Sequence, residues 1–274
     1  MLDEIKYEAG ASIGVYDLNG SNVVSGSPDA LRESSWSYDL GATGVEGASR
    51  EPTEVKIACV MLDGDYAPLR RAADRDIALG ASGRLHVNGV FKRANLTGWS
   101  RRSAAGGAAL YTVTAALQGG CWMRERRVEF EPTASAASSA LDLPYDLPHD
   151  LAAPPARTWI EGCEWCRCMI GFVVYGPCSN PRITIGGNVY RVDVSVPDGG
   201  HLTIDPLSRT VVLTDSRGGV VNAFGDASRG HGEGSGEYVF ERLPEGVSEV
   251  SWSNSFSFTA IVYEEEAMPP CEMR

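Results

Sequence analysis

The sequence predicts a mostly β protein of two domains, a β-rich N-terminal domain with one short helix and a C-terminal antiparallel β-sandwich. Apolar and polar residues alternate along many short stretches, and clusters of Gly, Pro, Asn and Asp separate those stretches. A segment rich in Pro and Asp divides the chain near its middle. The 274 residues, 43% of them hydrophobic, are enough for one large core or two ordinary ones.

Strands are expected in the first half where apolar residues gather between turn signals. These stretches are 55–62, 111–117 and 122–130. A hairpin is expected over 84–91, because Asn88-Gly89 is a dipeptide that tight two-residue hairpin turns favour.

One short helix is expected between the first two of these strands, over 67–79. Four apolar residues lie near helical spacing there: Leu69, Ala72, Ala73 and Ile77. Gly80 follows directly, and glycine commonly ends a helix at this position.

A linker is expected at the centre of the chain, where the tetrapeptides Leu143-Pro144-Tyr145-Asp146 and Leu147-Pro148-His149-Asp150 repeat one another. Proline disfavours both helix and central strand, and stretches rich in Ala, Ser and Pro flank the repeat. The sequence therefore divides into a domain over 1–134, a linker over 135–156 and a domain over 157–274.

The second half carries the clearest strand pattern. Every second residue from Tyr190 to Val196 is apolar, and Pro197-Asp198-Gly199-Gly200 then turns the chain. Further strands are expected at 202–205, 210–214, 238–241, 247–252 and 256–263. Because no helical period separates these strands, they predict an antiparallel sandwich.

The net charge of −12 is concentrated in the second half, since residues 1–140 carry −2 and residues 141–274 carry −10. Such an acidic surface repels phosphate backbones, so no specific binding of nucleic acid is expected. No run of about 18 apolar residues occurs, and therefore no membrane insertion is expected. The acidic start, Met1 to Glu4, does not resemble a secretory signal, so the protein is expected to begin in a cytoplasm.

Four of the seven cysteines cluster and are the candidates for a metal site: Cys163, Cys166, Cys168 and Cys178. Four thiolates can hold zinc. On a strand, however, Cys166 and Cys168 would share one face while Cys163 points to the other. Free cysteines also serve as small core residues. We therefore expect no metal, with zinc as the alternative.

No catalytic residue and no cofactor-binding residue is expected. The glycine-rich stretch 225–237 lacks the lysine of a phosphate-binding loop. The four histidines stand in no zinc-protease motif, and no serine occupies a nucleophile elbow. The sequence thus gives no positive indication of an enzyme.

The order of several motifs resembles the distal tail proteins of phages with long, non-contractile tails. "GRLHVNGVFKRANLTGWS" (83–100) is similar to a hairpin of that family, and Trp122 to Phe130 to its domain-closing strand. "LPYDLPHDL" (143–151) is similar to its crossing between domains. In the second half, "ITIGGNVYRVDVSVPDGGHLTIDPLSRTV" (183–211) and "EYVFERLPEGVSEVSWSNSFSFTAIVYEEEAMPP" (237–270) resemble its strand pairs and closing run. The glycine-rich stretch and the cysteine cluster depart from the family.

This resemblance implies a structural protein of the virion, made in the bacterial cytoplasm and placed at the tail tip of a phage or prophage. Its N-terminal domain would be split-barrel-like and form a ring, usually of six copies, between the tail tube protein and the tail hub protein. Its C-terminal sandwich would be galectin-like or carbohydrate-module-like. That sandwich would dock a receptor-binding protein or bind host glycans.

A ring needs two different surfaces on each subunit, because its neighbours meet head to tail. The candidates for these surfaces are apolar residues of the first domain: Ile13, Tyr16, Val87, Val90 and Phe91. Charge reversal at Val90 or Phe91 is expected to dissociate the ring and leave the monomer folded.

Two other functions remain open from the sequence. The six tryptophans and ten tyrosines are compatible with a carbohydrate-binding module, because exposed aromatic rings can stack on sugars. Trp159, Trp165 and Trp252 are the residues considered for this role. The other alternative is a cell-wall hydrolase.

Overall fold

The computed structural model describes residues 3–26, 28–62, 66–132, 158–164 and 167–271. These residues form strands for the most part, with one α-helix, which confirms the predicted fold class. Contacts divide the chain into two compact units: unit 1 (Met1–Arg124 with Glu265–Arg274) and unit 2 (Glu125–Glu264). The chain enters unit 2 within β10 (Trp122–Phe130) and leaves it within β21 (Phe258–Glu266).

Unit 1 is built on an antiparallel sheet with the order β3-β6-β9-β8-β7-β1-β2. Its strands are β1 (Ile5–Glu8), β2 (Val15–Asp17), β3 (Val23–Val24), β6 (Thr53–Leu62), β7 (Gly83–Val87), β8 (Val90–Ala105) and β9 (Ala108–Leu117). The start of β10 pairs with the start of β8. Along β6 burial alternates residue by residue, as its sequence predicts.

The helix α1 (Ala67–Ala78) covers the core of unit 1 with Leu69, Ala72 and Ala73, three of the four residues predicted to do so. The fourth, Ile77, is exposed, and the neighbouring Asp76 is fully buried instead. Asp76 accepts hydrogen bonds from the Tyr7 hydroxyl (2.7 Å) and from the backbone N–H of Ala11 (2.7 Å). This carboxylate therefore ties the helix to the turn between β1 and β2.

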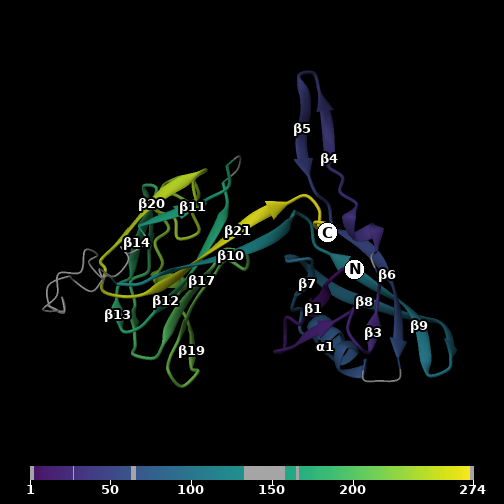
Figure 1. Ribbon diagram of the computed structural model, residues 1–274. Coiled ribbons are helices and arrows are strands. Elements are labelled where there is room, and N and C mark those ends of the chain that lie inside the picture. Colours follow the sequence, from purple (N-terminus) through teal and green to yellow (C-terminus); the bar gives the residue numbers. More distant parts are fainter. Residues whose placement is uncertain (1–2, 27, 63–65, 133–157, 165–166, 272–274) are drawn as a thin grey trace, which may run out of the picture. The chain divides into compact units, whose positions relative to one another are not determined.

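Two hairpins of unit 1 differ in their surroundings. The β7–β8 hairpin turns on Asn88 (φ 48°) and Gly89 (φ 81°), which confirms the predicted turn. The second hairpin consists of β4 (Ser37–Gly41) and β5 (Gly44–Ser49) and follows the 3₁₀ helix η1 (Asp29–Arg32). Among the described strands, β4 and β5 pair only with each other. Figure 1 shows this hairpin rising from the rest of unit 1.

The last described residues return to unit 1. The Asn88 side chain donates to the carbonyl oxygen of Pro270 (2.9 Å), and Arg124 pairs with Glu266 (3.2 Å). Contacts thus group 265–271 with the N-terminal strands, whereas the division drawn from the sequence counted them with the second domain. The predicted linker, 135–156, lies outside the described residues.

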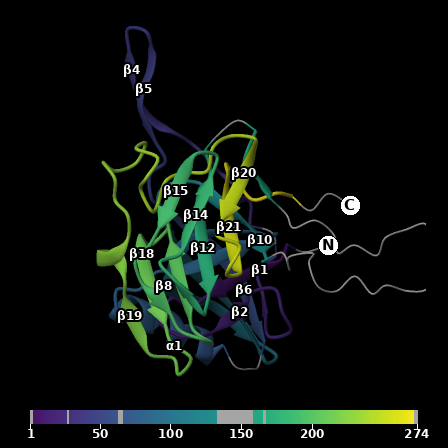
Figure 2. The same ribbon diagram turned by 90° about the vertical axis from the view of Figure 1, so that its left-hand side faces the viewer.

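Unit 2 is a sandwich of two antiparallel sheets (Figure 2). One has the order β19-β18-β17-β12-β21-β10, and the other has the order β11-β20-β14-β15. The elements not yet bounded are β11 (Trp159–Glu161), β12 (Met169–Tyr175), β13 (Cys178–Ser179), β14 (Arg182–Ile185), β15 (Asn188–Arg191), β16 (Ser195–Val196), β17 (His201–Asp205), β18 (Thr210–Thr214), β19 (Val220–Asn222), the 3₁₀ helix η2 (Phe224–Asp226) and β20 (Val247–Trp252).

Aromatic side chains from both sheets fill the core of unit 2. Phe130 stacks on Phe258 with ring centroids 4.7 Å apart, and Trp252 meets Phe258 edge-on at 5.4 Å. Phe172 of one sheet contacts Tyr190 of the other at 4.8 Å. Burial of such rings is the main stabilising contribution to a sandwich of this kind. The predicted antiparallel sandwich is confirmed.

Two strand predictions in unit 2 are wrong. The strand expected over 190–196 is broken into two. Residues up to Arg191 pair with β14, whereas Ser195 and Val196 pair with β13. The stretch 238–241 is a tight turn in which the Glu241 N–H donates to the Tyr238 carbonyl (2.8 Å). Its apolar residues are buried without forming a strand. The strands expected near 202–205, 210–214, 247–252 and 256–263 are present as β17, β18, β20 and β21.

Candidate functional site

The β4–β5 hairpin, residues 37–49, is called the arm below and is the most exposed regular element of unit 1. All residues of β5 and nearly all of β4 are exposed. Leu40 (78% exposed) and Val45 (59%) are direct cross-strand partners, so they form an apolar pair on one face. Tyr38 adds an exposed ring.

The other face of the arm is acidic. Asp39 and Glu46 are also cross-strand partners, and no Lys, Arg or His lies between residues 37 and 49. Like charges placed directly opposite one another destabilise a hairpin. The arm therefore carries two negative charges and no positive one.

The base of the arm is anchored to unit 1. The Arg50 guanidinium lies 4.3 Å from the centre of the Trp36 ring, which fixes the two ends of the hairpin side by side. Arg50 also donates to the carbonyl oxygen of Ala267 (3.5 Å) and to the Ser34 hydroxyl. A two-stranded hairpin without further contacts is marginally stable in water. The exposed apolar residues make the arm a candidate contact surface.

The interface residues predicted from the sequence fall into two groups. Val87, Val90 and Phe91 are buried in unit 1, so they offer no surface to another subunit, and this corrects their proposed role. Ile13 is fully exposed, whereas Tyr16 is half-buried against the core of unit 1. The structure does not bring the five together into one patch. Apolar strand residues serve cores as well as interfaces, so sequence alone could not separate the two roles.

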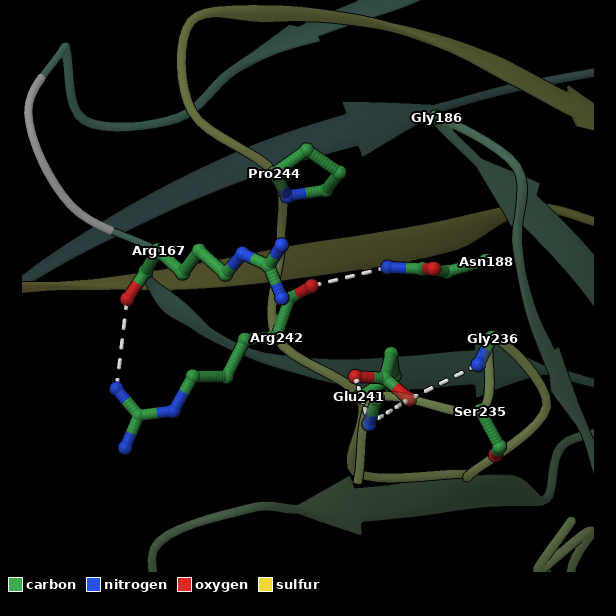
Figure 3. Close-up of a pocket in the computed structure, with 9 residues that line it drawn as sticks. Arg167, Gly186, Asn188, Ser235, Gly236, Glu241, Arg242 and Pro244 are labelled. Atoms are coloured by element: carbon green, nitrogen blue, oxygen red, sulfur yellow. Dashed lines mark hydrogen bonds between the residues drawn. The ribbon is translucent and has the colours of Figure 1, made fainter. Parts of the chain in front are cut away.

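A polar pocket of about 320 Å³ lies in unit 2 (Figure 3). The side chains of Arg167, Asn188, Glu241 and Arg242 line it together with residues of the glycine-rich stretch. Asn188 donates to the Arg242 carbonyl oxygen (3.0 Å), and Arg242 pairs with Glu233 (3.0 Å). The nine residues lining the pocket include no aromatic side chain.

Glu241 organises the glycine-rich stretch beside this pocket. Its buried carboxylate accepts hydrogen bonds from the backbone N–H groups of Gly234 (2.8 Å) and Gly236 (3.2 Å). Both glycines have positive φ, which side-chain-bearing residues rarely adopt. This role could not be predicted from the sequence, because a carboxylate five to seven residues from its donors follows no local motif.

The structure describes three of the four clustered cysteines. Cys168 is buried in the core of unit 2, and its sulfur accepts a hydrogen bond from the Cys163 N–H (3.2 Å). Cys178 is half-buried against the same core, and burial raises the pKa of its thiol. Cys166 lies outside the described residues. No group of three or more metal-binding side chains occurs in the part of the chain that the structure describes.

The tryptophans considered for sugar binding are dispersed. Trp252 packs in the core of unit 2, Trp159 is exposed on β11, and Trp165 lies outside the described residues. The described helices include none that is long and apolar enough to cross a bilayer.

No protein-family model matches the sequence, and no curated protein matches it. Solved structures do match the fold. Chains of the phage p2 baseplate in its activated conformation align with TM-scores of 0.61 (with Sr) and 0.62 (with Ca), at 10% identity. Each alignment covers 98% of this chain and 100% of the other. The SPP1 Dit protein, described as a paradigm of hub adsorption apparatus in phages that infect Gram-positive bacteria, aligns at 10% identity over 96% of this chain and 99% of the other. Its TM-score of 0.46 is too low to add support.

At 10% identity these alignments establish fold, not activity. The match runs through both units and leaves almost none of either chain unaligned. The chain therefore has the two-unit β fold of a phage baseplate protein, which confirms at the level of fold the resemblance to phage tail proteins seen in the sequence.

Proposed function

We propose that the protein is a structural component of a phage tail tip. In this role it forms a ring that joins the tail tube to the tail hub and docks receptor-binding proteins. The observation that carries the proposal is the fold shared with a baseplate chain over 98% of this chain. No catalysis is part of this role, and the protein would reside in the virion after synthesis in the bacterial cytoplasm.

The exposed arm is a reason to propose a ring. A closed ring of identical subunits needs two unlike surfaces on each copy, one of which inserts into or covers the other. The exposed Leu40 and Val45 and the acidic Asp39 and Glu46 make the arm one such surface. Burying one Leu or Val side chain contributes about 1.5–3 kcal/mol. Six identical contacts in a closed ring would hold it firmly.

Each of the two units is proposed to contact different partners. Unit 1 carries the arm and would make the ring that stacks on the tail tube protein and the hub protein. Unit 2 has a closed aromatic core and an independent surface pocket, which suits a module that docks a receptor-binding protein. The net charge of −12 over the whole chain disfavours retention of passing DNA.

The test is the mass and shape of the purified protein. We expect negative-stain images to show closed rings, and mass photometry to give six protomers of 29.3 kDa each. A protein that stays monomeric alone and also with the tube and hub proteins would contradict the proposal. Loss of turbidity of a peptidoglycan suspension would contradict the non-catalytic role.

A second candidate function is binding of host glycans by unit 2. The pocket of about 320 Å³ favours it, because Arg167, Asn188 and Glu241 carry groups that bond sugar hydroxyls. A glycan array should then show a ligand that Arg167→Ala and Asn188→Ala abolish. An array without any ligand, or one that both variants leave unchanged, would remove this candidate.

A further inference from the structure

We propose that β19 of unit 2 pairs with β19 of a second copy across a two-fold axis, which joins two sheets edge to edge. The strand β19 (Val220–Asn222) is the last strand of the sheet β19-β18-β17-β12-β21-β10, and no described strand pairs with its outer edge. Figure 2 shows β19 beside β18 at the edge of unit 2. This contact is separate from the ring contact of the proposed function.

The outer edge of β19 presents backbone hydrogen-bonding groups. The Ala223 N–H donates to the Val211 carbonyl oxygen (2.8 Å), so residue 223 faces β18. Backbone direction alternates along an antiparallel strand, and Val221 therefore faces β18 as well. The N–H and C=O groups of Val220 and Asn222 consequently point away from β18. Among the described residues, no hydrogen bond reaches these outward groups.

Two copies of this edge are complementary to each other. In an antiparallel arrangement centred on Val221, Val220 of each copy lies opposite Asn222 of the other copy. The N–H of each residue in such a pair can donate to the carbonyl oxygen of the other. Val221 then lies opposite Val221 of the second copy, with the two Cα atoms about 4.5 Å apart. The same patch thus serves on both copies, as a two-fold contact requires.

The side chains of β19 favour the same arrangement. Val221 lies opposite Leu213, which packs against the core of unit 2, so both belong to the apolar inner face of the sheet. Val221 is nevertheless 60% exposed, because no strand follows β19. A second β19 would cover this open side with another valine. Apolar side chains directly opposite one another stabilise an antiparallel pair.

The edge carries none of the features that commonly prevent such pairing. Edge strands are often protected by charged side chains, proline or bulges. Residues 218–224 contain no charged residue and no proline, and β18 and β19 pair without a register shift. The turn before β19 is also fixed, since the Asp215 carboxylate accepts a hydrogen bond from the Gly219 N–H (2.7 Å). By contrast, β11 and β15 at the edges of the other sheet carry Glu161 and Arg191.

The net charge of −12 opposes association of two copies, but the edge itself is not repulsive. Arg217 precedes the uncharged stretch and Asp226 follows it, so antiparallel pairing brings opposite charges toward each other at both ends. Repulsion between more distant charges is screened beyond about 8 Å at physiological salt. Three residues per strand bury far less than the ~1,200 Å² of a stable interface. The pair is therefore weak and leaves the six-protomer ring of dilute protein unchanged.

Disulfide formation between copies tests the pairing and its register. All variants carry Cys271→Ser, because Cys271 is exposed. At about 1 mM protein, Val221→Cys should form a covalent dimer with oxidised glutathione, since a Cα separation of ~4.5 Å suits a disulfide. Val220→Cys is the matched control. It should not crosslink to itself, but it should crosslink to Asn222→Cys when the two proteins are mixed.

A second change removes the backbone contact. Val220→Pro eliminates an N–H that points away from β18, so the melting temperature should be kept while crosslinking through Val221→Cys falls at least about tenfold. Crosslinking through Val221→Cys that is absent, or no faster than through Val220→Cys, or unaffected by Val220→Pro would overturn the inference. The ring is judged separately, because dilute Val220→Pro protein should still give six protomers.

Discussion

The β7–β8 hairpin and the arm belong to the same unit and are both two-stranded, but they bury very different fractions of their side chains. In the first, Val87 and Val90 are cross-strand partners with no exposed surface. In the second, Leu40 and Val45 are cross-strand partners and mostly exposed. The first hairpin is flanked by β1 and β10, and the second has no strand beside it among those described.

This difference shows that an apolar cross-strand pair does not reveal which surface covers it. The β7–β8 hairpin has the clearer sequence pattern, with Asn88-Gly89 at its turn and apolar residues on its buried face. The arm has a weaker apolar pattern, and its side chains are exposed on both faces. In the proposed ring, the contact surface of unit 1 is therefore sought at the arm, where no neighbouring described strand covers the side chains.

Val90→Asp is expected to have the largest effect. It places a charged group at a position that has no exposed surface, at a cost of several kcal/mol. We expect unit 1 to unfold, which circular dichroism and thermal denaturation would show. A folded Val90→Asp monomer that merely fails to assemble would restore Val90 to the interface and contradict its burial.

Val45→Asp makes the same change in the arm and should leave the fold untouched. Because Val45 is exposed in the monomer, the melting temperature should stay within about 2 °C of the wild-type value. Self-association should weaken about tenfold or more, since the apolar contact is lost. Sedimentation velocity measures this. The comparison between hairpins fails if Val45→Asp lowers the melting temperature as Val90→Asp does.

Glu241→Gln is expected to act locally in unit 2. The amide keeps one acceptor but loses the charge that holds Gly234 and Gly236, at a cost of about 1–3 kcal/mol. Hydrogen exchange of the glycine-rich stretch should accelerate while the two sheets keep their protection. Glu237→Gln, an exposed neighbour, is the control. Equal exchange in both variants would show that Glu241 does not order the stretch.

A rise in pH to about 10 should produce the smallest of these effects. Burial raises the pKa of the Cys59 thiol in the core of unit 1 to about 12, from an ordinary value of 9.0. The neutral Cys59 thiol therefore makes its full contribution to the free energy of unfolding below about pH 9. This contribution is lost as the pH rises toward 12. Between pH 9 and 10 the loss is about 1 kcal/mol. Cys59→Ala should flatten that decline in denaturant titrations under reducing conditions.

Much of the fold was predictable because local chemistry and tertiary environment agree. Asn88-Gly89 forms the predicted turn, and the period of two along β6 matches its burial. The prediction over 238–241 failed, since a buried apolar stretch in a turn has the same composition as a strand. A change of partner after Arg191 could not be foreseen either, because pairing is set by distant residues.

Less of the candidate site was predictable. Ile13 was identified and is exposed, but the arm was missed: its short, glycine-containing strands have few apolar residues. The pocket of unit 2 depends on residues from separate segments that only the folded chain brings together. Asp76 and Glu241 are hidden for the same reason, since nothing local distinguishes a buried carboxylate from a solvated one.

In the proposed function the arm assembles the protein into a ring. Sedimentation velocity of the wild type beside a variant whose residues 37–49 are replaced by a Gly-Ser-Gly turn tests it most directly. The short turn is feasible because Trp36 and Arg50 already lie together. We predict a discrete species of six protomers for the wild type and a folded monomer for the variant. A ring that survives removal of the arm, or a wild type that never associates, would contradict this account.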